Sequence, residues 1–283
     1  MLNEIIEALP DISGQHARTS RVYALLEKTA SQAVKASQLT RTEGAYVNLG
    51  GFGKIDLPYY KMGTVDTLDL FGLDELIIFS FYWTNRYRYK NAADIGANLG
   101  LHSILMSRCG WQVNAYEPDP IHAELLRRNL KNNDTTNVEL FEAAVSDKPG
   151  TLEFVRVLGN TTGSHLSGAK VNPYGDLERF PVKVLAIDDI MSSVDFVKMD
   201  AEGQERTIIL ATNTDHWRNT DMMVEVGSAE NAHAIFEHLE TLGVNAFSQK
   251  LGWQQAVSLE DMPMSYKEGS LFLSTKSSMP WAT

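Results

Sequence analysis

The chain has 283 residues, 43% of them hydrophobic and 22% charged, which is typical of a globular protein. Its formal net charge of −11 disfavours binding to nucleic acid, because only residues 86–90 form a short basic segment. No apolar run is long enough to cross a bilayer, residues 1–9 lack the basic region of a secretory signal, and Cys109 is the single cysteine. We therefore expect a cytoplasmic protein without disulfides or a membrane span.

Residues 1–40 are predicted to be helical, since Val22, Leu25 and Leu26 recur at helical spacing among alanines. Residues 44–60 differ, because glycines separate short strand-like runs that end at Pro58. Residues 76–83 form a short apolar run whose periodicity assigns neither helix nor strand. We expect residues 1–88 to form a helical and β-hairpin extension before a second unit, residues 89–276.

Strands and helices alternate from residue 91 onward, which predicts a mostly parallel sheet covered by helices on both faces. Asp119 and Pro120 are typical of a helix start, a cap followed by a first-turn proline. The expected strands are 92–95, 113–116, 138–145, 194–199, 222–226, 244–247 and 270–273. The expected helices are 101–109, one beginning at residue 120, 204–211 and 231–242.

Residues 146–190 interrupt this alternation and are predicted to be an insertion. Strands are expected at 151–157 and 182–185, with a polar stretch at 159–168 between them. Loops of this length in compact domains often serve as lids or contact substrate. The alternative is a mobile loop without such a role.

A glycine-rich turn directly follows the first strand of the alternating region and directly precedes a helix. It reads Asp94-Ile-Gly96-Ala97-Asn98-Leu-Gly100. Glycine lets a backbone turn sharply and approach a ligand closely, and the helix start directs its positive dipole end at the turn. Glu117 lies 23 residues after Asp94, at the end of the second strand, where an acid can accept hydrogen bonds from both ribose hydroxyls.

A nicotinamide dinucleotide is the rival ligand for such a turn, and its fingerprint is Gly-x-Gly-x-x-Gly. Counted from Gly96, the second and third glycine positions hold Asn98 and Leu101. The Asn98 side chain lies where a pyrophosphate would approach the backbone, and Asp94 favours an ammonium or sulfonium over a phosphate. The pattern therefore favours S-adenosylmethionine.

Four segments of the chain resemble the FkbM-type methyltransferase family. They are Ala93-Asp-Ile-Gly-Ala-Asn-Leu-Gly-Leu-His-Ser103, Tyr116-Glu-Pro-Asp-Pro120, Ala143-Ala-Val-Ser-Asp147 and Asp195-Phe-Val-Lys-Met-Asp-Ala-Glu-Gly203. The resemblance covers about residues 90–273, and the second and fourth segments are its most specific parts. It implies the α/β fold of class I methyltransferases, a doubly wound sheet of seven strands that is mostly parallel with an antiparallel last strand. It also implies S-adenosylmethionine as cofactor and methylation of hydroxyl oxygens on sugars or natural-product scaffolds.

The resemblance also implies the residues that bind the cofactor. Asp94, Gly96, Ala97, Asn98 and Gly100 would surround the methionine moiety. Glu117, followed by Pro118, would hold the ribose, and Ala143 and Ala144 would lie by the adenine. The helical first 40 residues are not part of the family pattern, which leaves the substrate open.

A base near the acceptor oxygen should assist methyl transfer, because an alcohol has a high pKa. Strand alternation places Lys198 and Asp200 on one face at the end of the fourth strand. Asp200 is therefore the first candidate for a catalytic residue that positions the acceptor or the donor, and Glu202 is the second. The alternative for both is to cap the helix that starts near Gln204.

Two histidines and a third acid complete the set of candidates. His102, after the glycine turn, and His165, in the insertion, are candidate bases, with packing beneath the turn and exposure on a loop as the alternatives. Glu225 ends the fifth strand, and with Asp200 and Glu202 it could bind a divalent cation. Pairing of Glu225 with a lysine or arginine is the favoured alternative.

These observations together predict an S-adenosylmethionine-dependent O-methyltransferase that acts on a small molecule or glycan by in-line methyl transfer. An N-methyltransferase acting on a small amine is one alternative, and a non-catalytic protein that binds an adenosyl ligand is another. The sequence leaves open the methyl acceptor, the general base, the need for a divalent metal and the oligomeric state.

Overall fold

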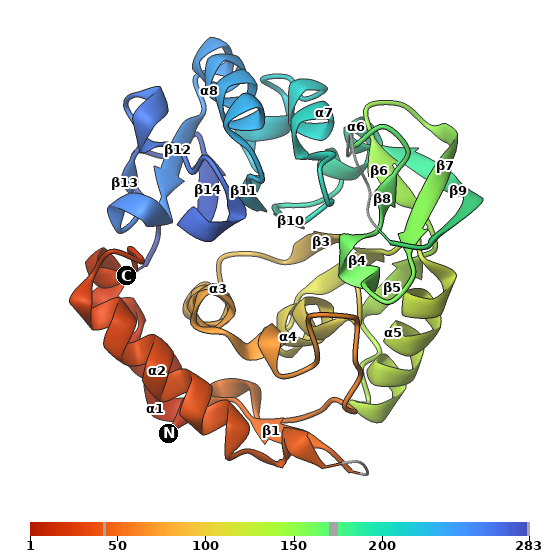
Figure 1. Ribbon diagram of the computed structural model, residues 1–283. Coiled ribbons are helices and arrows are strands. Elements are labelled where there is room, and N and C mark those ends of the chain that lie inside the picture. The colour runs from red at the N-terminus through yellow and green to blue at the C-terminus, as the bar shows by residue number, and fades with distance from the viewer. Residues whose placement is uncertain (42–43, 170–174, 282–283) are drawn as a thin grey trace.

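A computed structural model describes residues 1–41, 44–169 and 175–281, and within them a central sheet has eight strands (Figure 1). Five neighbours run parallel, in the order β5 (Val138–Phe141), β4 (Gln112–Tyr116), β3 (Asn91–Ile95), β10 (Phe196–Met199) and β11 (Asp221–Glu225). β14 (Ser270–Ser274) lies antiparallel between β11 and β12 (Asn245–Ser248). The expected sheet of seven strands with an antiparallel last strand is confirmed, and the two-residue strand β13 (Gln254–Gln255) adds an edge to it.

Helices cover both faces of this sheet (Figure 1). One face packs against α3 (Leu73–Thr84), α4 (Leu101–Arg108) and α5 (Pro120–Asn132). The other packs against α6 (Ile187–Met191), α7 (Glu205–Leu210) and α8 (Ala229–Leu242). Because the five parallel strands point the same way, their carboxyl ends meet at one edge of the sheet, where open α/β sheets bind ligands.

Helix α3 contains the apolar run that periodicity left unassigned. Its residues from Leu76 to Tyr82 are all buried, because α3 lies between the sheet and the N-terminal helices. A helix that is apolar on every side has no amphipathic period to detect, so its sequence resembles a buried strand as much as a buried helix.

The N-terminal residues form an outer layer beyond α3, made by α1 (Leu2–Ala8) and α2 (Arg21–Lys35) (Figure 1). β1 (Tyr46–Asn48) and β2 (Lys54–Asp56) then pair as an antiparallel hairpin. Leu9 is fully buried, and the Ser80 hydroxyl of α3 donates to the Ile6 carbonyl at 2.9 Å. One hydrophobic cluster includes these N-terminal side chains, α3, α4 and strands of the sheet.

The segment expected as a single strand at 138–145 is divided between two sheets, so that expectation is wrong. The chain turns after β5, where the Ala143 N–H donates to the Phe141 carbonyl at 2.8 Å, and β6 (Ala144–Ser146) joins a second sheet. This four-stranded sheet has the order β6-β9-β7-β8, with β7 (Gly150–Val157), β8 (His165–Leu166) and β9 (Leu177–Ala186). It contains most of the expected insertion at 146–190, of which residues 170–174 lie outside the described residues.

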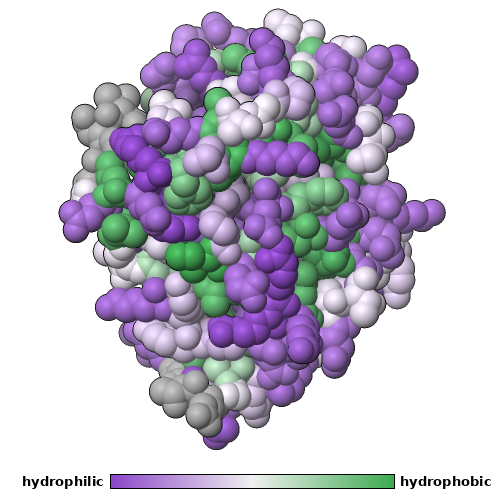
Figure 2. Space-filling view, turned by 90° about the vertical axis from the view of Figure 1, so that its right-hand side faces the viewer, coloured by the Kyte–Doolittle hydropathy of each residue, from purple (hydrophilic) through white to green (hydrophobic). Residues whose placement is uncertain are grey.

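The surface on the side of α5 and the four-stranded sheet mixes hydrophilic and hydrophobic side chains (Figure 2). In the described part of the chain, no helix is both long and apolar enough to cross a membrane.

We expect Phe81→Ala to lower the free energy of unfolding by about 3–5 kcal/mol. Phe81 of α3 is fully buried, with its ring centroid 6.0 Å from that of Phe196 in β10 and 5.3 Å from that of Phe272 in β14. Urea denaturation measures the change, and Tyr87→Ala, at an 85% exposed residue, is the control that should change stability by less than about 0.5 kcal/mol. A loss below about 1 kcal/mol for Phe81→Ala would contradict the packing of α3 described above.

Candidate active site

The glycine turn after β3 crosses directly over the backbone that follows β10. A Cβ on Gly96 would lie 1.8 Å from the Asp200 carbonyl oxygen, so no residue with a side chain fits there without moving one of the two loops. Gly96 also has a φ of +77°, a left-handed conformation that favours glycine. The Asp200 N–H donates to the Ile95 carbonyl at 3.0 Å. The structure therefore holds Gly96 and Asp200 in fixed contact.

Hydrogen bonds to the end of β4 fix the shape of the same turn. The N–H groups of Gly96 and Ala97 each donate to the Tyr116 carbonyl at 3.0 Å. The Asn98 N–H donates to Glu117 Oε2 at 2.8 Å, and the Asp119 N–H donates to Glu117 Oε1 at 2.8 Å. Because these N–H groups of the turn already have partners, they are not available to a phosphate, which argues against a dinucleotide ligand.

The buried polar atoms left without a partner at this turn are hydrogen-bond acceptors. Among the described residues, Asn98 Oδ1 and Asp94 Oδ1 are buried without a hydrogen-bond partner. Asp94 Oδ2 accepts from the Ser103 hydroxyl at 2.6 Å, and Lys198 Nζ lies 3.9 Å from Asp94 Oδ1. Each Glu117 oxygen also has a lone pair that its single N–H bond leaves free. A ligand that brings donors, such as ribose hydroxyls and an ammonium, fits this set of acceptors, and S-adenosylmethionine is such a ligand.

Burial raises the pKa of Glu117 to about 8, and the charges of Asp119 and Asp94 add to this effect. The two N–H bonds from Asp119 and Asn98 oppose the shift without cancelling it. Glu117 therefore changes charge near neutral pH, and any hydroxyl that donates to it will favour its ionised form.

The alanines expected beside the adenine follow β5 directly and are 1% and 6% exposed at Ala143 and Ala144. The Glu117 N–H donates to the Phe141 carbonyl at 3.1 Å, which places Ala143 close to Glu117 at the edge of the sheet. Pro118 links Glu117 to Asp119. The structure thus brings the ribose and adenine candidates together.

An arginine that sequence reasoning missed supports the Glu117 loop. Arg156 of β7 donates to both carboxylate oxygens of Asp119, at 2.7 Å from Nε and 2.6 Å from Nη2, and its side chain is 6% exposed. Asp119 in turn accepts the Ile121 N–H at 2.8 Å and caps α5. The four-stranded sheet is therefore anchored to the loop that carries the candidate ribose ligand.

A second group of charged residues lines a small cavity between α3 and the ends of β10, β11 and β14. Its polar lining comprises Glu75, Lys198, Asp200, Glu225 and Ser270. Burial raises the pKa of Glu225 well above its usual range, with the charges of Asp200 and Glu75 adding to the effect and Lys198 opposing it. Burial alone would lower the pKa of Lys198, but Asp94, Asp200 and Glu75 raise it above its ordinary value. Lys198 therefore stays protonated, offsets the negative charge of these acids and does not act as a general base.

The loop between β10 and α7 is held by another acid, Glu205. The Glu205 carboxylate, in the first turn of α7, accepts the N–H groups of Ala201 at 2.9 Å and of Gly203 at 3.0 Å. Glu202 has a φ of +50°, so the chain bends there between the strand end and the helix. Sequence reasoning missed Glu205, although acids are common in the first turn of a helix.

The two candidate histidines lie in different surroundings. His102 Nδ1 lies 2.9 Å from the Tyr82 hydroxyl, and its Nε2 lies 3.0 Å from a Glu75 carboxylate oxygen, in agreement with packing beneath the turn. His165 is 2% exposed in β8, with Nδ1 3.0 Å from the Gly163 carbonyl, so it is not the exposed loop residue that was the alternative. Neither histidine is among the residues that line the acidic cavity.

A metal site is not formed by the acids that sequence analysis grouped. Among the described residues, no three His, Cys, Asp or Glu side chains are arranged to hold a metal ion, and this includes Asp200, Glu202 and Glu225.

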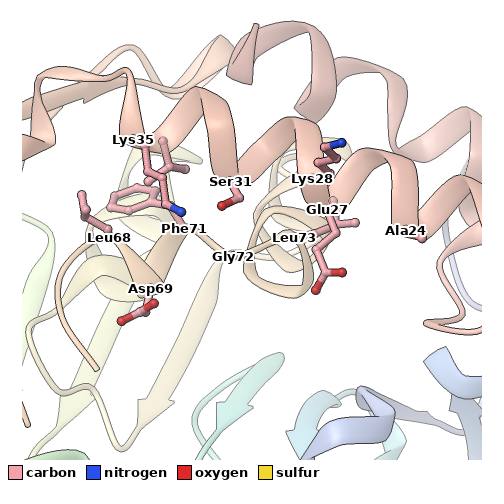
Figure 3. A pocket seen from close by; sticks show the side chains of 11 residues that line it. Ala24, Glu27, Lys28, Ser31, Lys35, Leu68, Asp69, Phe71, Gly72 and Leu73 are labelled. Carbon is pink, nitrogen blue, oxygen red and sulfur yellow. The ribbon is translucent and has the colours of Figure 1, made fainter. Parts of the chain in front are cut away.

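Another hollow, of about 430 Å³, lies between α2 and residues 68–73 (Figure 3). Its acids, Glu27 and Asp69, are balanced by Lys28 and Lys35, and its lining includes no residue of the glycine turn or of the strand ends. We therefore place the site at the sheet edge.

Comparisons with known proteins identify the family of the chain. The model of the methyltransferase FkbM domain matches residues 94–256, which is more than half of the chain. The chain belongs to the FkbM methyltransferase family. Residues 94–256 thus form a methyltransferase FkbM domain.

A curated relative, methyltransferase sdnD of Sordaria araneosa, is 27% identical in an alignment of length 157 that covers 44% of this chain and 61% of that protein. This chain therefore matches less than two thirds of the relative's length. Among solved structures, a SAM-dependent methyltransferase from Agrobacterium tumefaciens has a TM-score of 0.40 at 6% identity, covering 72% of this chain and 62% of that one. The O-methyltransferase TomG of Streptomyces achromogenes, in complex with SAM, has a TM-score of 0.36 at 13% identity, covering 69% and 77%. The fold assignment rests on the strand order described above.

We expect Arg156→Gln to lower the free energy of unfolding by about 3 kcal/mol, because it leaves the buried Asp119 carboxylate without its charged partner. Chemical denaturation measures the loss. Arg179→Gln is the matched control, since Arg179 lies in β9 of the same sheet and its ion pair with Glu153 is exposed, so its effect should stay below about 1 kcal/mol. Equal effects of the two substitutions would show that Arg156 does not anchor the loop.

Proposed function

We propose that this methyltransferase transfers the methyl group to a hydroxyl oxygen of a sugar or a natural-product scaffold. The contact between Gly96 and Asp200 is the observation that carries the proposal. Gly96 belongs to the turn that would hold the donor, whereas the Asp200 side chain lines the acidic cavity. Asp200 therefore connects the two sides of the site. Its backbone contacts the turn on the donor side, and its carboxylate can serve the acceptor.

On the donor side, we assign the ribose hydroxyls to Glu117 and the methionine moiety to Asp94 and Asn98. The unpartnered acceptors Asn98 Oδ1 and Asp94 Oδ1 support this assignment. We propose that the ligand lies close to the backbone at Gly96, Ala97 and Gly100. The adenine would lie beside Pro118, Ala143 and Ala144. The cofactor supplies a methyl group already activated on a sulfonium, so the protein mainly aligns the reactants and excludes water.

On the acceptor side, Asp200 is our first candidate to accept the proton of the attacking hydroxyl. Its carboxylate lies at the carboxyl end of β10, on the strand face that also carries Lys198, which stays cationic. Glu202 is the second candidate. His102 is a weaker one because Tyr82 and Glu75 contact both of its ring nitrogens, and His165 is weaker because it is buried in β8.

The acidic cavity argues against methylation of an amine nitrogen. Neighbouring carboxylates raise the pKa of an amine and keep it protonated, and a protonated amine has no lone pair with which to attack. A hydroxyl keeps its lone pairs under the same conditions. We therefore favour the O-methyltransferase over the N-methyltransferase.

We also propose that residues 1–88 form a unit that completes the acceptor side of the 89–276 methyltransferase unit, since Glu75 and Ile78 of α3 line the cavity. The net charge of −11 supports a small-molecule or glycan substrate over a nucleic acid. A cytoplasmic location fits the single, buried cysteine.

Asp200→Asn should lower turnover by roughly 100-fold while the affinity for S-adenosylhomocysteine changes by less than a few-fold. The test is a screen of glycans and hydroxylated metabolites with a labelled methyl donor, followed by kinetics on the acceptor found. Glu230→Gln is the control, because the Glu230 side chain is 82% exposed, pairs with Arg206 and does not line the acidic cavity. Labelled products that carry the methyl group on nitrogen would overturn the proposed reaction.

The affinity for S-adenosylhomocysteine should rise roughly tenfold between pH 7 and pH 9. In the free protein Glu117 keeps its proton up to about pH 8, whereas ribose hydroxyls donate to its ionised form, so binding releases a proton and strengthens as pH rises. The same shift makes the stability of the free protein fall with rising pH, because the folded state holds a proton that the unfolded chain has lost.

Calorimetry across this pH range measures the effect, with Glu117→Gln as the reference. The substitution should weaken binding and remove the part of the pH dependence that belongs to Glu117. A pH profile that is identical in both proteins would remove Glu117 from the ribose site.

A further inference from the structure

We propose that the acidic cavity binds a positively charged amine of the acceptor, next to the hydroxyl that receives the methyl group. The substrates would then be amino sugars or amino alcohols. This inference rests on the proposed function and deepens it, because it names the acceptor class for the same site. The carboxylates of Asp200 and Glu225 would hold the ammonium, with the Ser270 hydroxyl beside them.

The charges around the cavity do not balance. Lys198 lies 3.9 Å from Asp94, and Glu75 lies 3.0 Å from His102. Arg18, which also acts on Glu225 through its charge, is ion-paired with Asp74. Lys198 and Arg18, the cations that act on Glu225, thus already face other acids. Two carboxylates at the ends of neighbouring strands repel each other unless a cation or a proton lies between them.

The Ser270 hydroxyl is a second and independent indication of a ligand. Ser270 is 1% exposed, and among the described residues its Oγ has no hydrogen-bond partner. It lies directly opposite Glu225 in the pairing of β14 with β11, so both side chains project from the same face of the sheet, and both line the cavity. A buried hydroxyl without a partner lowers stability, and a ligand that bonds to it would recover that loss.

An ammonium matches the charge of this cavity better than a neutral group or a metal ion does. A neutral hydroxyl would leave the repulsion between Asp200 and Glu225 in place. The described acids are not arranged as metal ligands, which argues against a divalent cation. A primary ammonium has three donors, enough for both carboxylates and Ser270. The raised pKa of Glu225 agrees with this, because without a ligand a proton would take the place of the cation.

The acceptor amine would therefore serve for recognition and not for reaction. Held by carboxylates, it stays protonated and cannot attack the methyl group. The neighbouring hydroxyl attacks instead, and its proton passes to a carboxylate of the same cavity as the carbon–oxygen bond forms and the bond from sulfur to the methyl carbon breaks. One site would thus fix both the identity of the acceptor and the atom that is methylated.

The test compares two sugars that differ only by an amine and a hydroxyl at one carbon. The protein, saturated with S-adenosylhomocysteine, is titrated with glucosamine and with glucose at pH 7 by calorimetry. We expect glucosamine to bind at least tenfold more tightly than glucose. Glu225→Gln should reduce this preference to less than threefold, and Ser270→Ala, which removes a hydroxyl without a protein partner, should weaken glucosamine binding a few-fold. Glu230→Gln should leave the preference unchanged.

The outcomes distinguish this inference from the proposed function. Equal affinities, no binding of either sugar, or a preference that survives in Glu225→Gln with its folding intact would each overturn the ammonium subsite. The first titration, with S-adenosylhomocysteine alone, reports on the donor site independently. If that ligand fails to bind, the donor-site assignment fails, whereas the sugar comparison on the free protein still reports on the cavity.

Discussion

The crossing of the turn at Gly96 over the Asp200 carbonyl is the constraint on which the rest of the site depends. With a Cβ only 1.8 Å from that oxygen, any side chain at position 96 would separate the two loops. The turn is also bonded to Tyr116 and Glu117, so three neighbouring strand ends, β4, β3 and β10, are locked together. A donor held by the turn and an acceptor held at Asp200 would meet at a fixed distance, which is the main requirement of an in-line displacement.

The four-stranded sheet and the N-terminal residues pack against the central sheet, and each brings a charged side chain to this edge. The four-stranded sheet brings Arg156 to Asp119 and so supports the loop of Glu117. The N-terminal residues bury α3, which brings Glu75 to the cavity at β10 and β11. Burial is also what raises the pKa values of Glu117 and Glu225, so shielding from water and tuning of charge have the same structural origin.

The sequence predicted the features whose signals are local. The turn between β3 and α4, the position of Glu117 and the start of α5 at Asp119 and Pro120 each depend on a few adjacent residues, and the order of elements predicted the parallel sheet. The misses involve distant partners. Arg156 meets Asp119 across 37 positions, Ser270 meets Glu225 across two strands, and α3 is apolar on all sides because two layers cover it. Residues 138–145 read as one strand because periodicity does not reveal which sheet each half joins. The ligand roles assigned to the individual site residues remain predictions.

The most direct test of the account is a crystal structure of the protein with S-adenosylhomocysteine bound. The account predicts that both ribose hydroxyls lie at hydrogen-bond distance, about 3 Å, from the Glu117 carboxylate. It also predicts that the homocysteine chain lies along the turn at Gly96, with its sulfur facing Asp200. A ligand bound elsewhere, or a Glu117 carboxylate turned away from the ribose, would contradict it.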